Sequence, residues 1–229
     1  GGDIVVGSSI SLTGGDWDQP LNYGFDINLT AVGNVIATGQ ISTNGQGTST
    51  TSSVVSNGGD VVISAGGYVR VVAGINTSGG SNNSNVTRVN SDGGSVGITG
   101  AGGVTMLGDI TSWNGYLGNT GYGTNGSIEI SSGNGTVTSG SGAGENDGQV
   151  SGLLQGGDFT KSGTGIFVMK GSNTYKGTTT VSTGALQLGS SNSIPTGTSL
   201  TVTGTLDLGG FDQTVSSLSG AGLISSSGS

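Results

Sequence analysis

The feature that most constrains the fold is a sequence block that recurs three times without a gap. The copies begin at Asp26, Asp60 and Ser95, and a degraded fourth copy begins at Ser127. Apolar residues occupy the same five offsets in the first three copies: Ile27, Leu29, Val35, Ala37 and Ile41; Val61, Ile63, Val69, Val71 and Ile75; Val96, Ile98, Val104, Met106 and Ile110. Because a short repeat of this kind cannot bury its apolar face alone, we expect the copies to stack on one another.

Within each block, apolar residues alternate with polar ones, which is the period of a β-strand with one buried face. The 229 residues include 51 Gly, and each Gly inside a helix costs about 1 kcal/mol relative to Ala, so helices are disfavoured. Apolar residues make up 31% of the chain and come in alternating pairs, which argues against disorder. The chain is therefore predicted to be all-β.

Stacking equivalent strands produces parallel ladders with columns of equivalent side chains inside. We therefore predict a single-stranded parallel β-helix, a solenoid with loop excursions. A sandwich would use Asn-Gly turns between antiparallel partners, whereas the Asn-Gly pairs at 44–45, 114–115 and 125–126 flank the excursions. The predicted interior columns are Ile27, Val61, Val96 and Ile128; Val35, Val69 and Val104; and Leu186 with Leu206.

The repeat shortens in the last third of the chain. Phe167, Leu186 and Leu206 follow one another at intervals of 19 and 20 residues, which leaves no room for an excursion. We predict one continuous solenoid in which residues 1–158 form decorated coils and residues 159–229 form compact coils. The excursions of the decorated coils are predicted at 44–57, 78–92 and 113–125.

Residues 163–189, GTGIFVMKGSNTYKGTTTVSTGALQLG, resemble the autotransporter-associated β-strand repeat, whose pattern includes G-x-N-x-Y-x-G-x-T-x-V-x-x-G-x-L-x-L. Its usual continuation is matched at 204–208 and 213–220, so the resemblance covers about residues 157–224. The earlier part is similar to the looser G-G-x-V-x-I repeats of filamentous-haemagglutinin-type exoproteins. Both resemblances imply a secreted, right-handed parallel β-helix at a bacterial cell surface, and hence an extracellular location.

The sequence contains no signal peptide, translocator barrel or haemagglutinin secretion domain, so we expect an excised or processed piece of a longer protein. The absence of Cys suits a passenger that crosses an outer membrane unfolded. No apolar stretch is long enough to span a bilayer, so we expect no membrane insertion of this segment. A formal charge of −8 with five basic residues argues against a nucleic-acid partner.

No cofactor or metal site is predicted, and without His or Cys the chain lacks the usual nucleophile and zinc chemistry. Glycoside hydrolysis needs clustered carboxylates. Asp26 and Asp60 share a repeat offset, but the third copy has Ser95 there, and Asp109 and Glu129 are expected on separate coils. We therefore predict a non-enzymatic protein, with a polysaccharide-active β-helix enzyme as the remote alternative.

The third excursion contains five residues suited to holding a glycan: Trp113, Asn114, Tyr116, Asn119 and Tyr122. Aromatic rings stack on sugar faces while amides bond the hydroxyl groups. The alternative is that these aromatic side chains cap the coil or pack the excursion on itself. Asn173 and Tyr175 match positions of the repeat pattern and are predicted to be structural.

Two classes of function remain for such a chain. In the first, a rigid stalk presents its excursions to a glycan or protein on a host or neighbouring cell, which is adhesion. In the second, the chain is a structural subunit of an extracellular filament or matrix. Uncapped strand edges at residues 1–6 and 223–226 would then stack end to end with other copies, although truncation of a longer rod explains open ends more simply.

Overall fold

The structure is a computed structural model, and it describes residues 2–12, 24–45, 57–80, 92–113, 125–132, 136–138 and 154–228. All regular elements in these ranges are β-strands, and every strand pair is parallel. No helix in the described ranges meets the length and apolarity that a membrane span requires.

The described strands form successive coils along one axis, and the earlier coils carry up to three strands each. These strands are β1 (Ile4–Val6) and β2 (Ile10–Ser11); β3 (Ile27–Ala31), β4 (Val35–Ala37) and β5 (Ile41–Ser42); β6 (Val61–Ala65), β7 (Tyr68–Val71) and β8 (Ile75–Asn76); β9 (Val96–Gly100), β10 (Gly103–Met106) and β11 (Ile110–Thr111); β12 (Ile128–Ser132), β13 (Thr136–Thr138) and β14 (Leu154–Gln155).

The later coils carry two strands each. These strands are β15 (Phe159–Ser162) and β16 (Ile166–Met169); β17 (Thr179–Val181) and β18 (Ala185–Leu188); β19 (Ser199–Val202) and β20 (Thr205–Asp207); β21 (Ser217–Ser219) and β22 (Leu223–Ser225).

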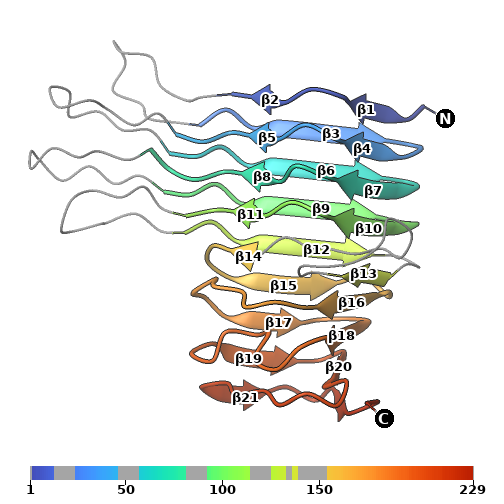
Figure 1. Cartoon of the computed structure of the whole chain (residues 1–229), viewed down its shortest axis with the longest axis vertical. Helices are drawn as coiled ribbons and strands as arrows, with labels where there is room; N and C mark the ends of the chain where they lie inside the picture. The colour runs from blue at the N-terminus through green and yellow to red at the C-terminus, as the bar shows by residue number, and fades with distance from the viewer. Residues whose placement is uncertain are drawn as a thin grey trace, which may run out of the picture.

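Equivalent strands of successive coils line up as the faces of a rod. The first face is the eight-stranded sheet from β3 to β21, which runs through both kinds of coil (Figure 1). The second face holds β1-β4-β7-β10 and then β13-β16-β18-β20-β22. The third face, β2-β5-β8-β11-β14, ends at β14. The chain termini lie at opposite ends of the stack (Figure 1). The structure thus confirms the predicted parallel β-helix.

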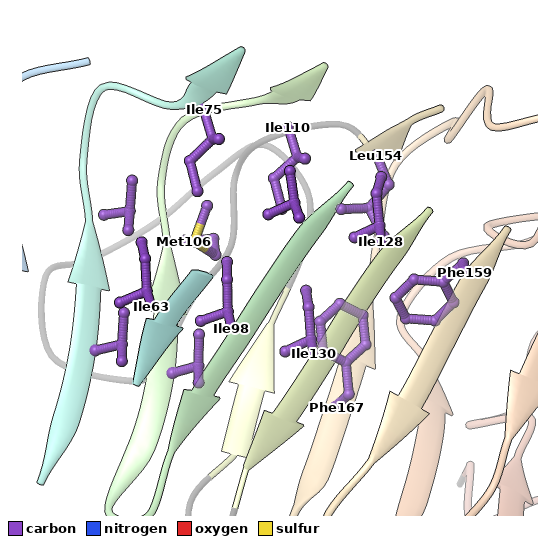
Figure 2. Close-up of a cluster of buried hydrophobic side chains, with 14 of the residues drawn as sticks. Ile63, Ile75, Ile98, Met106, Ile110, Ile128, Ile130, Leu154, Phe159 and Phe167 are labelled. Carbon is purple, nitrogen blue, oxygen red and sulfur yellow. The ribbon is translucent and has the colours of Figure 1, made fainter. Parts of the chain in front are cut away.

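Side chains at equal offsets lie directly over one another. Val35 pairs with Val69 and Val69 with Val104, and all three side chains are buried. Leu186 pairs with Leu206 in the compact coils. The first face holds a further buried column in register: Ile27, Val61, Val96 and Ile128. Figure 2 shows aliphatic side chains such as Ile63, Ile98 and Ile130 gathered in the interior between the strands.

The first compact coil, that of β15 and β16, has a packed aromatic group in place of a third strand. The ring centroid of Phe159 lies 5.5 Å from that of Phe167 and 5.7 Å from that of Tyr175. Tyr175 is buried, and its hydroxyl group bonds the Thr179 hydroxyl at 2.6 Å. Larger rings therefore fill the space that a third apolar strand fills in the longer coils.

Asn173 performs the structural role predicted for it. Its Oδ1 accepts a hydrogen bond from the Leu154 amide at 2.9 Å, and its Nδ2 donates to the Ser193 carbonyl at 2.8 Å. The side chain therefore connects the coil before it to the coil after it. An amide is suited to this place because it offers both an acceptor and donors.

Acidic and hydroxyl side chains align at the corner before the first face. The Asp60 amide donates to Asp26 Oδ1 at 2.8 Å, and the Ser95 amide donates to Asp60 Oδ1 at 2.7 Å. Asp158 Oδ1 accepts from the Thr178 amide at 2.7 Å in the compact coils. The shared offset of Asp26 and Asp60 thus supports the backbone of the next coil.

Lys161 is a buried basic residue that the sequence analysis did not identify. It lies in register with Ile130 and Val181, within a column of apolar side chains. Its Nζ donates to the carbonyl oxygens of Ser162 at 2.6 Å and Gly163 at 2.8 Å. Burial lowers the pKa of Lys161 to about 8 from its ordinary 10.5, because desolvation disfavours the charged form.

We predict that Val69→Asp lowers the free energy of unfolding by about 3 kcal/mol or more, because the carboxylate would be buried without a partner. The control is Thr105→Asp, since Thr105 pairs with Arg70 between two inward-facing positions. Denaturant unfolding followed by circular dichroism measures both variants. Equal stability of the two variants would mean that the inward and outward positions are wrongly assigned.

We also predict that Lys161→Met raises stability at pH 7. The folded-state pKa of Lys161 is depressed, so between about pH 8 and 10.5 the unfolded chain binds more protons and parent stability rises with pH. The advantage of the Met variant should therefore shrink across that window. Thermal melting at several pH values tests this, with the exposed Lys176→Met as control. A constant difference between Lys161→Met and the parent would contradict the assignment.

Candidate binding site at the excursion edge

Each of the first two excursions leaves the third face at a point where the outgoing and returning segments are hydrogen-bonded to each other, which we call its neck. The Gly59 amide donates to the Thr43 carbonyl at 2.8 Å, and the Thr43 hydroxyl donates back to the Gly59 carbonyl. In the next coil the Gly94 amide donates to the Thr77 carbonyl at 2.7 Å, and Thr77 Oγ1 donates to the Gly94 carbonyl at 2.6 Å. Two hydrogen bonds thus join the outgoing and returning chain at the same place in both coils.

The third excursion closes in a related way. The Gly126 amide donates to the Ser112 carbonyl at 3.0 Å, while the Ser112 hydroxyl donates to the Gly94 carbonyl at the start of its own coil. Glycine is required at these necks because the chains approach closely. A Cβ on Gly94 would lie 2.1 Å from the Gly59 carbonyl oxygen, and one on Gly126 would lie 2.0 Å from that of Gly94.

The bases of the excursions also stack on each other. The Gly45 amide donates to the Ser78 carbonyl at 2.8 Å, and the Gly79 amide donates to the Trp113 carbonyl at 2.9 Å. We call these bases the excursion edge, and it comprises residues 42–45, 57–59, 76–79, 92–94, 111–113 and 125–126. Its layers are separated by the strand spacing of about 4.8 Å. The edge therefore offers one continuous surface along the rod.

Trp113 lies at the end of this edge nearest the compact coils. The side chain is half-buried, and its Nε1 donates to Gln155 Oε1 at 3.0 Å. The exposed Lys176 places its Nζ 5.0 Å from the centroid of the indole ring, which is cation–π distance. Three successive coils thus contribute an aromatic ring, an amide and an ammonium group to one site.

Among the five glycan-site residues predicted from the sequence, Trp113 is the one that the structure describes. Asn114, Tyr116, Asn119 and Tyr122 lie outside the described residues. Their grouping with Trp113 therefore stays a prediction.

Sequence reasoning missed Gln155 and Lys176 because no motif marks them. Thr111 pairs with Gln155, although the third excursion and the chain that follows it, residues 112–154, separate the two in the sequence. Aligning the pair Ile110-Thr111 with Leu154-Gln155 would have been the available signal.

Within the described ranges, no three His, Cys, Asp or Glu residues gather as a metal site would require. Several of the described carboxylates bond protein groups: Glu129 accepts from the Ser162 hydroxyl at 2.8 Å. Asp207 accepts from the Ser227 hydroxyl and from the Ser227 and Gly209 amides. Led by the Ser227 hydroxyl, these bonds lower the pKa of Asp207, against a smaller opposing effect of burial. The groups that the described site presents are an aromatic ring, amides, hydroxyl groups and the Lys176 ammonium group.

Comparison with known proteins identifies the repeat. Residues 159–188 match the family described as passenger-associated-transport-repeat, which supports the autotransporter passenger repeat predicted for this stretch from its resemblance. A curated relative is the adhesin BmaC autotransporter of Brucella suis biovar 1 (strain 1330), 44% identical over 80 residues. That match covers 34% of this chain and 2% of the relative's length. No solved structure matches the chain significantly.

We predict that Thr77→Val loosens the second neck and lowers the free energy of unfolding by about 1 kcal/mol, since one buried hydrogen bond is lost at nearly constant volume. Thr99→Val is the matched control, because Thr99 is exposed on β9. Chemical denaturation of both variants gives the difference. A Thr77→Val protein as stable as the control would show that the neck contributes nothing to the coil.

Proposed function

We propose that this chain is part of a bacterial surface adhesin, in which the β-helix is a stalk and the excursion edge is the binding surface. The passenger repeat at 159–188 and the similarity to a protein named as an adhesin support this proposal. A passenger of this type is delivered to the outside of the cell, so the proposed location is the cell surface or the extracellular space. The proposed role is binding without catalysis.

The proposed ligand class is a glycan on a host or neighbouring cell. The observation that carries this proposal is the half-buried Trp113, held by Gln155 and contacted by Lys176 at the end of a stacked polar edge. Sugars are bound by aromatic faces beside a few positioned polar groups. The hydrogen bond to Gln155 fixes the indole ring before any ligand arrives, which reduces the entropy lost on binding.

The test is Trp113→Ala, compared with Tyr68→Ala as a matched aromatic control. Tyr68 is 43% exposed on β7 of the second face, away from the excursion edge. We expect Trp113→Ala to weaken binding to a glycan array and to cells by about ten-fold or more, and Tyr68→Ala to leave binding unchanged. Both proteins should keep the parent melting curve. Unchanged binding by a folded Trp113→Ala protein would place the ligand elsewhere.

A structural filament remains the second candidate function. In the coil of β21 and β22, Leu218 is 54% exposed and Leu223 is 61% exposed, and each of these strands pairs on one side. A second copy stacking end to end would cover such an edge, as would a following coil of a longer polypeptide. Negative-stain imaging over a range of concentrations distinguishes the two, because end-to-end assembly requires rods that lengthen with concentration.

A further inference from the structure

We infer that the excursion edge binds an uncharged, extended polysaccharide whose chain runs parallel to the rod axis, with successive sugars contacting successive coils. This inference rests on the proposed adhesin function and specifies its ligand. It follows from three properties of the third face: a polar column in register, the state of its amide groups, and its charge.

The first property is a column of hydrogen-bonding side chains with one residue in each coil. Ser42 pairs with Asn76, Asn76 with Thr111, and Thr111 with Gln155. The residue before each of them is buried in the rod: Ile41, Ile75, Ile110 and Leu154. Asn76, Thr111 and Gln155 are the partly exposed members of this polar column on the outer side of the face, since side chains alternate in direction along a strand, whereas Ser42 is buried and its hydroxyl group donates to Asn44 Oδ1.

The spacing of this column suits a polymer. Parallel strands repeat at about 4.8 Å, so the column offers a polar side chain at each such step. An extended sugar chain advances by a similar length for each ring, and each ring presents hydroxyl groups to one side. A polysaccharide lying along the axis would therefore meet an equivalent protein group at each sugar, which is a form of multivalent binding.

The second property is that two amides of the column are oriented by bonds through their oxygen atoms. Asn76 Oδ1 accepts from the Ser78 amide at 3.0 Å, and Gln155 Oε1 accepts from Trp113 Nε1 at 3.0 Å. Within the described part of the chain, neither amide nitrogen donates a hydrogen bond. Each therefore keeps an oriented NH₂ group for a sugar hydroxyl, and each is a donor that costs little further ordering to use.

The third property is charge. The chain carries a formal charge of −8 with five basic residues, and one of these, Lys161, is buried. A polyanionic glycan needs a positive surface to bind, as nucleic acids do. Lys176 brings one ammonium group beside Trp113, whereas a polyanion needs positive charges along its length. The amides and hydroxyl groups of the column are suited to neutral sugars, with Trp113 as the stacking platform at one end.

The outer side of the eight-stranded first face provides an internal comparison. Several of its hydroxyl groups bond one another or a neighbouring carboxylate: Thr201 pairs with Ser219 at 3.0 Å, and Ser162 donates to Glu129 at 2.8 Å. No aromatic side chain lies on the outer side of its described strands. This face is a source of control positions for the experiment.

The experiment measures binding of neutral oligosaccharides by calorimetry, using disaccharide, tetrasaccharide and octasaccharide members of β-1,4-glucan, β-1,4-mannan and α-1,4-glucan series, with heparin as the polyanion. We expect at least one neutral series to bind more tightly as it lengthens, by about ten-fold from disaccharide to octasaccharide, and heparin to bind more weakly than that octasaccharide. Equal affinity across all lengths of every series would overturn the inference, and so would tighter binding of heparin.

Variants test the column itself. Asn76→Leu and Gln155→Leu should each weaken octasaccharide binding several-fold and disaccharide binding less, while Asn28→Leu, an exposed amide on β3, should change neither. Because Asn76→Leu also removes the bond to Ser78, the near-isosteric Thr111→Val is measured beside it, and all melting curves are compared. An effect of Asn28→Leu as large as those of the column variants would contradict the inference.

The two proposals fail in different ways. Binding to a glycan array or to cells that depends on Trp113 but not on sugar chain length or on the column leaves the adhesin proposal intact and removes the axial polysaccharide. Absence of binding to every glycan and every cell surface removes both.

Discussion

The parallel hydrogen-bonded ladder between successive coils is the constraint on which the rest of the structure depends. A coil buries its apolar side chains only when another coil lies on it in the same register. The stability of each coil therefore depends on its interfaces with the neighbouring coils. Register also determines what lies outside. Once Val35, Val69 and Val104 are aligned in one column, the residues that alternate with them along each strand, such as Arg70, must face outward. The interior column and the exterior polar column are therefore two consequences of one alignment.

The register between coils is kept across long excursions because hydrogen bonds join the two ends of each excursion where it leaves the coil. The hydrogen bonds between Thr43 and Gly59 and between Thr77 and Gly94 close each neck before the chain departs. Once the two ends of a loop are joined, a longer loop costs little additional closure free energy. The necks require small residues, since Cβ atoms on the stacked glycines would collide with the carbonyl group of the coil beside them.

The sequence predicted the coil because its signal is periodic and local. Equal offsets of aliphatic residues specify stacking without any knowledge of the turns between them, and the columns of Ile27 and of Val35 follow directly. The candidate binding site was harder to predict from the sequence. Trp113 was identifiable as an aromatic residue in an excursion, but Gln155 and Lys176 reach it only through pairing across coils of unequal length. Lys161 was missed for another reason: its offset calls for an apolar residue, and its ammonium group is accommodated only because carbonyl oxygens of its own turn lie within reach.

The position of the site follows from where the third face ends. After β14 no further strand joins this face in the described structure, and the chain instead places Asn173 against the β14 backbone and Tyr175 in the interior. The segment still lies over β14, since the Thr174 amide donates to the Leu154 carbonyl at 3.1 Å and the Lys176 amide to that of Gly156 at 2.9 Å. These bonds place Thr174 over Gln155, at the next position of the polar column, and Lys176 over Gly157, with its ammonium group 5.0 Å from the centroid of the Trp113 ring. A change in coil type thus creates a local arrangement that a uniform β-helix would lack, and it locates the aromatic end of the proposed binding column at the junction of the decorated and compact coils.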